Sequence, residues 1–319
     1  MKKTSIIAIL CIALSRLSCG RGEEGLRLLY WNIQNGMWAD QENDYKTFTD
    51  WVKGQKPDIC VWCEAQPIYK DGTHDNLDNL KEWRADSLLN CMWTRLGKRY
   101  GHKYVFIGGH RDNFPQVITS RYPLEAVDRI TGNGRDSIVS HGAGWARLRV
   151  AGQRINVVTL HTWPQKYGFN IAKEDRERSK AAAEGDLFRR MEMEYICKST
   201  ILKDSSGLWM MMGDFNSKSR KDNWVYNYPD DDTRLLVHDY ILGNTPYIDI
   251  INEDNRNNFI TSTYGRERID YVYCNPALAE KVQRCAIVTD DYTRPVRSQK
   301  YNRFCEPSDH RPIIVDFKL

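Results

Sequence analysis

Eight polar residues stand where apolar, strand-like runs of the sequence begin or end. They are Asn32, Glu64, His161, Asp214, Asn216, Asp270, Asp309 and His310. Asn32 closes the run LLYWN, for example, and Glu64 closes ICVWCE. Loops that are held by rigid strands are where binding and catalytic groups are commonly placed. We therefore expect these side chains to form one site.

The residue types point to one class of reaction. Asn, Asp and Glu supply hard oxygen ligands for Mg²⁺, with Mn²⁺ or Ca²⁺ as alternatives, and the sequence has no cluster of Cys and His that would suit zinc. Two histidines beside carboxylates can transfer protons or hold a phosphate. A divalent cation together with such groups suits the attack of an activated water on a phosphoester.

Each of these residues also has a structural explanation when it is taken alone. Asp214 and Asn216 share one side of an extended chain, because residues i and i+2 point the same way, but both also favour turns. Asp270 could form an ion pair with Arg266 or Arg268. The chemical interpretation is favoured because the eight residues occur together.

The elements that must position these residues follow from hydrophobic patterning. Runs rich in β-branched and aromatic residues predict strands at 26–33, 58–64, 103–109, 115–120, 144–150, 154–162, 208–215, 268–275, 285–289 and 311–319. Helical spacing predicts helices within 44–57, 76–101, 173–202 and 233–242. Polar loops are expected around 132–144 and 290–308. This mixture, without a break in composition, predicts one α/β domain over residues 26–319, with two sheets covered by helices.

Residues 1–19 read as an export signal. Lys2 and Lys3 precede a short apolar run, which is too short to span a membrane. Cys19 resembles the acceptor of a lipid anchor, and ordinary cleavage near Ala13 is the alternative. We expect an exported monomer at the outer surface or in the periplasm, whose contact with a membrane is made only through a lipid at Cys19.

Net charge gives little support for a particular partner. Without Lys2, Lys3 and Arg16 of the leader, the formal charge falls from +4 to +1. No strong basic field remains to steer the protein toward nucleic acid.

The cysteines beyond Cys19 number seven, so at least one cannot pair within the chain. Cys60 and Cys63 lie three residues apart on a predicted strand and should point to opposite faces, which argues against a zinc or redox pair. Cys285 and Cys305 are the candidate disulfide, and free buried thiols are expected for the rest.

The motifs together carry a resemblance. LLYWNIQNG, PDICVWCEA, ITSRYPL, VVTLHTW, GDFN, RIDYV and SDHRPIIV, in this order, resemble the motifs of the endonuclease/exonuclease/phosphatase superfamily from about Leu26 to the end of the chain. The resemblance implies a four-layer α/β/β/α sandwich of two mixed sheets flanked by helices, with the site at one edge.

Residue roles follow from the resemblance by matching motif. It implies Glu64 as the main metal ligand, with Asn32 beside it and Asp309 on the far side. Asp214 would orient or deprotonate the attacking water, and Asn216 would hold a phosphate oxygen. His310 would contact the phosphate or act as base, with Asp270 setting its tautomer, and His161 would serve the leaving group or the transition-state charge. Arg121 and Trp163 are candidate substrate contacts, with structural roles as the alternative for both.

The function predicted on this basis is an exported, divalent-metal-dependent phosphoesterase that hydrolyses P–O bonds by in-line attack of water. A phosphodiesterase or nuclease is favoured. A phosphomonoesterase or a sphingomyelinase-like phospholipase is the alternative within the enzyme class, and a surface binding protein without catalysis is the alternative outside it. Arg294, Arg297, Lys300 and Arg303 form a basic cluster near Asp309 that suits either nucleic acid or a small phosphorylated substrate.

Overall fold

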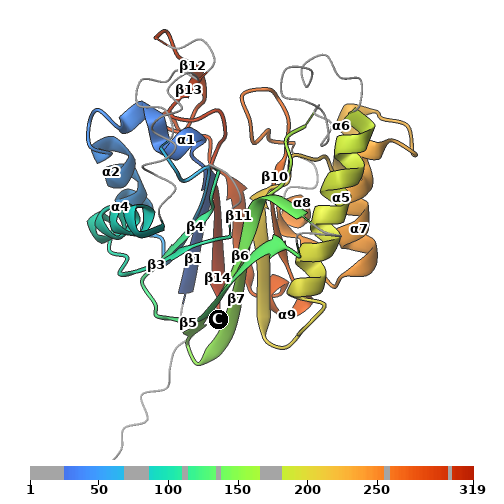
Figure 1. The fold of residues 1–319 in the computed structure, drawn as a ribbon, viewed down its shortest axis with the longest axis horizontal. Helices are drawn as coiled ribbons and strands as arrows, with labels where there is room; N and C mark the ends of the chain where they lie inside the picture. Colours follow the sequence, from blue (N-terminus) through green and yellow to red (C-terminus); the bar gives the residue numbers. More distant parts are fainter. Residues whose placement is uncertain are drawn as a thin grey trace, which may run out of the picture.

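Two six-stranded sheets pack face to face, and helices cover the outer side of each (Figure 1). The computed structural model describes residues 25–67, 86–109, 114–133, 138–165, 182–254, 259–300 and 304–319. The four layers confirm the predicted α/β/β/α sandwich. The export signal at 1–19 with Cys19, parts of the helices predicted at 76–101 and 173–202, and Arg303 lie outside the described residues.

The first sheet contains β1 (Gly25–Asn32), β2 (Ile59–Cys63), β3 (Tyr104–Ile107), β4 (Val117–Ser120), β11 (Val282–Ile287) and β14 (Ile313–Lys318). The second contains β5 (Leu124–Gly132), β6 (Ile138–Val150), β7 (Gln153–His161), β8 (Leu208–Asp214), β9 (Ile248–Asp249) and β10 (Asp270–Cys274). A separate pair consists of β12 (Val296–Arg297) and β13 (Cys305–Glu306). The helices are α1 (Gln34–Met37), α2 (Lys46–Gln55), α4 (Asp86–Arg99), α5 (Ala182–Ser199), α6 (Asn223–Tyr226), α7 (Leu236–Asn244), α8 (Ile250–Asp254) and α9 (Pro276–Ala279), with 3₁₀ turns η1 (Trp38–Asp40), η3 (Arg220–Asp222) and η4 (Thr233–Leu235).

Each sheet has one pair of parallel strands near its centre. The orders are β11-β14-β1-β2-β4-β3 and β5-β6-β7-β8-β10-β9. The pairs β1–β2 and β7–β8 are parallel, whereas β14 and β10 run antiparallel beside them. Two parallel strands end at the same edge, and an antiparallel neighbour begins there. Residues that end β1, β2, β7 and β8 therefore meet residues that precede or open β14 and β10.

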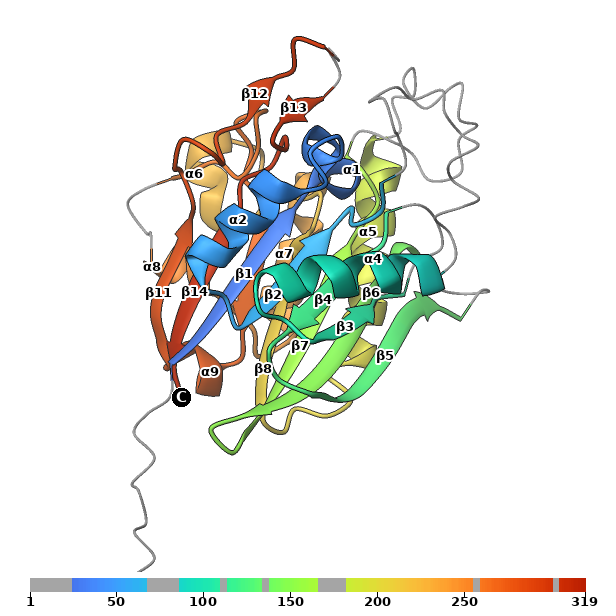
Figure 2. The same ribbon diagram turned by 90° about the vertical axis from the view of Figure 1, so that its left-hand side faces the viewer.

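Three apolar layers hold the sandwich together. Side chains such as Leu28, Val157 and Met210 fill the space between the sheets. A second cluster, which includes Phe48 and Trp93, joins α2 and α4 to the first sheet. Figure 2 shows these two helices lying over that sheet. A third joins α5 and α7 to the second sheet. Each strand that faces two layers is buried on both sides, which explains the continuous apolar runs in β1, β2 and β8.

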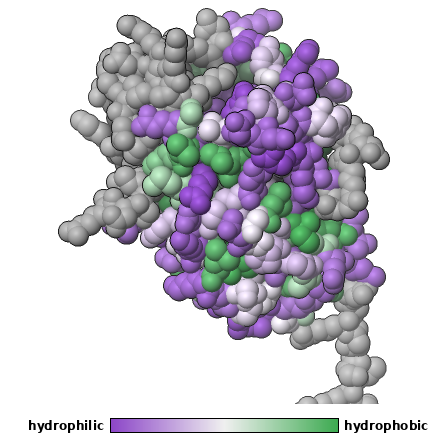
Figure 3. Space-filling view, turned by 90° about the vertical axis from the view of Figure 1, so that its right-hand side faces the viewer, coloured by the Kyte–Doolittle hydropathy of each residue, from purple (hydrophilic) through white to green (hydrophobic). Residues whose placement is uncertain are grey.

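The outer faces of the helices meet solvent. On the side of α5 and α7 the surface is largely hydrophilic, with apolar side chains in small separate groups (Figure 3). Leu187 and Met191 of α5 are exposed among them. No helix in the described part of the chain is both long and apolar enough to span a bilayer.

Two sequence predictions in this region are corrected by the structure. The expected loop at 132–144 is largely strand, because β6 already begins at Ile138, and β5 was not predicted at all. β5 is an edge strand whose residues are mostly exposed or half-buried, so it lacks a strong apolar pattern. Gly142, with φ of 85°, interrupts the alternation within β6.

The cysteines also differ in part from expectation. Cys285 and Cys305 do not form the candidate disulfide, because Cys285 points into the layer between the sheets while Cys305 lies on β13 beside a surface cavity. Cys60 and Cys63 lie in different apolar layers, which confirms that they point to opposite faces.

We predict that the buried imidazole of His238 on α7 makes stability depend on pH. Burial lowers the pKa of His238 to about 3, and its ring nitrogens lie 2.7 Å from Tyr273 Oη and 3.3 Å from Ser217 O. Because the unfolded chain takes up a proton here at a higher pH than the folded protein, stability falls as pH drops below about 6.5. In His238→Gln, the loss of unfolding free energy between pH 7 and pH 5 should be about 2 kcal/mol smaller than in the parent. Urea unfolding at both pH values measures this, and equal losses in the two proteins would contradict it.

Candidate active site

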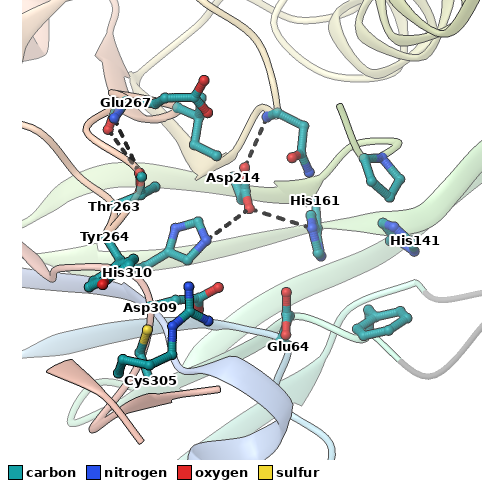
Figure 4. A pocket seen from close by; sticks show the side chains of 16 residues that line it. Glu64, His141, His161, Asp214, Thr263, Tyr264, Glu267, Cys305, Asp309 and His310 are labelled. Atoms are coloured by element: carbon teal, nitrogen blue, oxygen red, sulfur yellow. Dashed lines mark hydrogen bonds and ion pairs between the residues drawn. The ribbon is translucent and has the colours of Figure 1, made fainter. Parts of the chain in front are cut away.

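The ends of the central strands converge on one cavity of about 430 Å³ (Figure 4). Across β7, β8 and β10, His161 is paired in register with Asp214, and Asp214 with Asp270. Of the predicted residues, Glu64, His161, Asp214, Asn216, Asp309 and His310 line the cavity. Asn32 and Asp270 lie directly behind it, fully buried. The structure therefore places these eight residues close together at one end of the sandwich.

Asn32 joins the two sheets at the floor of the cavity. Its Nδ2 donates to Glu64 Oε1 at 3.3 Å and to Asp214 Oδ2 at 3.1 Å. Its Oδ1 accepts from the N–H of Gln34 at 3.1 Å. Asn32 thus lies beside Glu64 as expected, but both ends of its amide are engaged with protein groups, so it connects the carboxylates from behind.

Glu64 is held by the turn that follows β1. The backbone of Glu64 has a positive φ of 51°. The N–H of Asn35, which lies in that turn, donates to Glu64 Oε2 at 3.1 Å. Gly36 also has a positive φ, of 67°, and a Cβ there would lie 2.5 Å from Pro67 N, so no larger residue fits. Burial raises the pKa of Glu64, and the charge of Asp309 raises it further.

His310 is oriented by a buried relay. Its Nδ1 lies 2.8 Å from Asp270 Oδ2, and Tyr30 Oη donates to Asp270 Oδ1 at 2.6 Å. Burial alone would lower the pKa of His310, but Asp270, Asp309 and Asp214 outweigh it and hold the pKa well above the ordinary range. The suggested ion pair of Asp270 with Arg266 or Arg268 is not formed, since Arg268 pairs with Asp222 and Asp249.

Asp214 lies between the two histidines. Its Oδ2 is 3.7 Å from His310 Nε2 and 3.6 Å from His161 Nε2, and the N–H of Asn216 donates to its Oδ1 at 2.9 Å. Burial raises its pKa to about 7; the nearby His310 lowers the pKa, and Asp270 raises it. This carboxylate can therefore exchange a proton near neutral pH.

His161 is buried in the cavity wall. Burial, assisted by His141 and His310, lowers its pKa well below the ordinary value. Its Nδ1 is buried, with no hydrogen-bond partner in the described part of the chain. Asn216, next to it, donates from Nδ2 to Thr162 O at 3.1 Å.

Two predicted substrate contacts lie elsewhere. Arg121 pairs with Asp58 at 2.7 Å, at the end of β2 opposite Glu64, because β4 runs antiparallel to β2. A five-residue strand separates the two ends by roughly 17 Å. Trp163 does not line the cavity; its ring is buried and stacks on His141 with centroids 6.1 Å apart.

Other residues that line the cavity were not predicted as site residues from the sequence. These are Phe114, His141, Pro164, Thr263, Tyr264, Gly265, Glu267, Ile269 and Cys305. Arg297, from the basic cluster noted in the sequence, also lines the cavity and lies over the Tyr264 ring at 4.8 Å. Tyr264, Glu267 and Cys305 could have been predicted, because they lie close in sequence to the RID and SDHRP motifs. His141 stands in a glycine-rich stretch that has no such motif nearby.

The sequence pattern of the Endonuclease/Exonuclease/phosphatase family matches residues 29–310, a range that contains all eight of the polar residues. The chain belongs to this family. Among curated proteins, no sequence matches it.

Solved structures show the same family fold. The chain is similar to an AP endonuclease from Archaeoglobus fulgidus, with a TM-score of 0.59 and 18% identity over 92% of this chain and 100% of that one. It is also similar to the 3′ phosphatase NExo from Neisseria bound to a product DNA hairpin, with a TM-score of 0.61 and 14% identity over 92% of this chain and 100% of that one. For humanized D. rerio TDP2, the TM-score is 0.55 and the identity is 12%, over 92% of this chain and 99% of that one.

The oxygen donors of this family member fit a divalent cation. Glu64 and Asp309 face the same cavity, where burial and then the charge of Asp309 raise the pKa of Glu64, and a cation would offset both effects. One ligand atom from each of Asp214, Asp270 and His310 also lies within 4.8 Å of the others, but Asp270 is fully buried and does not line the cavity. Glu64 and Asp309 are therefore carboxylates that could hold a cation from the cavity, whereas Asp270 forms an ion pair with His310 behind it.

We predict that Asp270→Asn will lower the pKa of His310. Without the Asp270 charge, burial becomes the dominant influence and favours the neutral imidazole. Titration of the histidine signals by NMR measures the change. Tyr30→Phe serves as a matched control, since it removes only the distal hydrogen bond and should shift the His310 titration less. An unchanged His310 titration in Asp270→Asn would contradict the assigned relay.

Proposed function

We propose that this protein is a divalent-metal-dependent phosphodiesterase of nuclease type, with Mg²⁺ as the favoured ion. Family membership supports a phosphoester hydrolase. The observation that carries the proposal is the convergence of Glu64, Asp214 and His310 on one cavity, with Asn32 joining two of them. A binding protein without catalysis would have no need for buried carboxylates and imidazoles whose pKa values are moved in opposite directions.

In the proposed reaction, Asp214 accepts the proton of the attacking water. Its pKa near 7 suits a general base at neutral pH. His310, held protonated by Asp270, places positive charge toward the phosphoryl oxygens. Between the two roles considered for His310, its raised pKa favours contact with phosphate over action as a base.

Further residues would bind and orient the phosphate. Asn216, anchored on Thr162, faces a phosphoryl oxygen in this scheme, and neutral His161 donates to the oxygen on which charge develops. Glu64 and Asp309 would hold the cation, which when bound supplies charge neutralisation at the phosphate and lowers the pKa of water.

The substrate assignment rests on similarity and on the cavity rim. The names of two structural neighbours refer to an AP endonuclease and to a phosphatase bound to a DNA hairpin, which supports a nucleic acid or a related phosphoester. Exposed Arg297 over Tyr264 offers a cation and a ring beside the phosphate site. A phosphomonoesterase or a phospholipase would use the same core.

We also propose export, with the lipid anchor at Cys19. The support is the sequence of residues 1–19, with its basic start and short apolar run.

We predict Mg²⁺-dependent hydrolysis of bis-p-nitrophenyl phosphate that chelation abolishes. Glu64→Ala and His310→Ala should each lower kcat/KM by about 10² or more, because each removes charge stabilisation of the transition state. Arg121→Ala, distant from the cavity, is the matched control and should retain activity.

A panel of plasmid DNA, RNA, sphingomyelin and inositol phosphates then places the substrate. Intact DNA and RNA at high enzyme concentration, alongside consumption of a lipid or small phosphoester, would reject the nuclease assignment. No metal-dependent turnover of any of them would reject the phosphoesterase.

The rate should rise with pH up to neutrality. Asp214 must be ionised to accept a proton, so kcat/KM is expected to increase about tenfold per pH unit below the pKa of Asp214 and level off above it. A cation at Glu64 lowers that pKa, so the midpoint should fall at or below about 7. Asp214→Asn should lose this rising limb. A rate that is flat in the parent from pH 5 to 8, or that falls across this range, would contradict the role of Asp214.

A further inference from the structure

A second imidazole stands beside His161 in the cavity wall. The rings of His141 and His161 lie 4.4 Å apart at 39°, and both line the cavity, as Figure 4 shows. Phe114 packs edge-on against His141 with ring centroids 5.0 Å apart, and Trp163 stacks on His141 with an interplanar angle of 21°. His141 is therefore held in a ring stack at the point where a phosphoester would bind.

The ladder between β6 and β7 does not join the two histidines to each other. The antiparallel pairing of β6 and β7 ends at Ala143 and Leu160. His141 and His161 lie beyond that pair, and Gly142 with its positive φ separates His141 from the ladder. Some other interaction must fix the distance between the two chain segments.

Glu192 of α5 supplies that interaction. Its side chain is fully buried, and its Oε1 accepts from the N–H and the Oγ of Ser140, at 2.7 and 2.6 Å. Its Oε2 accepts from the N–H of Trp163 at 2.9 Å. One carboxylate thus links the neighbour of His141 to the segment that follows His161. Hydrogen bonds to an ionised acceptor are short and strong, which suits a fixed geometry.

Arg189, one turn earlier on α5, holds the same segment from the other side. Its Nη1 donates to Trp163 O at 3.1 Å and to Pro164 O at 2.8 Å. The N–H and the C=O of Trp163 are therefore both bound by α5, by two buried side chains of opposite charge.

We infer that His141 is a third active-site histidine and that Glu192 is the positioning residue that holds His141 and His161 as a pair. The inference rests on the proposed phosphoesterase function. Two imidazoles on one wall can approach the same phosphoryl or ester oxygen. A displacement of about 1 Å in such a group can cost about 10² in rate. Because the pair would act on charge that develops in the transition state, loss of the support should lower kcat more than it changes KM.

Glu192→Gln tests the positioning role. Glutamine keeps the size but turns an N–H₂ toward one of the donors that the carboxylate accepts from. We expect kcat for bis-p-nitrophenyl phosphate with Mg²⁺ to fall about tenfold or more, with KM within twofold. In ¹⁵N-histidine-labelled protein, the ring signals of both His141 and His161 should move.

The matched control is Glu194→Gln on the same helix. Glu194 pairs with Arg190 and Lys198 at the surface, so this variant should keep kcat, KM and the histidine signals of the parent. Ser140→Ala removes one of the three hydrogen bonds and should lower kcat less than Glu192→Gln, with no additive loss in the double variant.

Two results would overturn the inference. The first is a folded Glu192→Gln protein with kcat within twofold of the parent and unmoved histidine signals. The second is His141→Phe, which keeps a ring in the stack, turning over like the parent. If the parent itself lacks phosphoesterase activity, the proposed function fails, and the NMR signals still test whether Glu192 holds the histidine pair.

Discussion

The structure of the cavity depends on the side-chain amide of Asn32, because this amide donates hydrogen bonds to carboxylates from two different sheets. Glu64 and Asp214 carry like charges and are withdrawn from water, which is unfavourable unless hydrogen bonds compensate. The N–H groups of Asn35 and Asn216 add to the compensation. The acidic cavity can exist in an apolar sandwich because these donors are built into its floor.

Tyr30, Asp270 and His310 form a second polar connection between the sheets. Tyr30 belongs to the first sheet and Asp270 to the second, and His310 precedes β14 of the first. The apolar layer between the sheets stabilises their contact but specifies no relative register, since burial is not directional. Directional hydrogen bonds at one end of the sandwich set the relative positions of the groups that would act on substrate.

Much of this arrangement could be predicted because strand ends are marked in the sequence. Asn32, Glu64, His161 and Asp214 each follow an apolar run, and parallel pairing then brings them together. β5 could not be predicted, because an exposed edge strand needs few apolar residues. His141 was not recognised for a related reason, since the glycines around it resemble a loop and Glu192, which accepts a hydrogen bond from the neighbouring Ser140, is distant in sequence. Arg121 was placed wrongly because a motif gives proximity along the chain and not the end of the strand at which a residue emerges.

The direction of β1 places Gly25 and the cavity at opposite ends of the sandwich. β1 begins at Gly25, paired with Lys318 near the carboxyl terminus, and runs to Asn32 at the cavity floor. The carboxyl terminus, which is marked C in Figure 1, lies at the end of the sandwich opposite α1. A support attached upstream of Gly25 would therefore be joined to the end of the sandwich that lies away from the cavity.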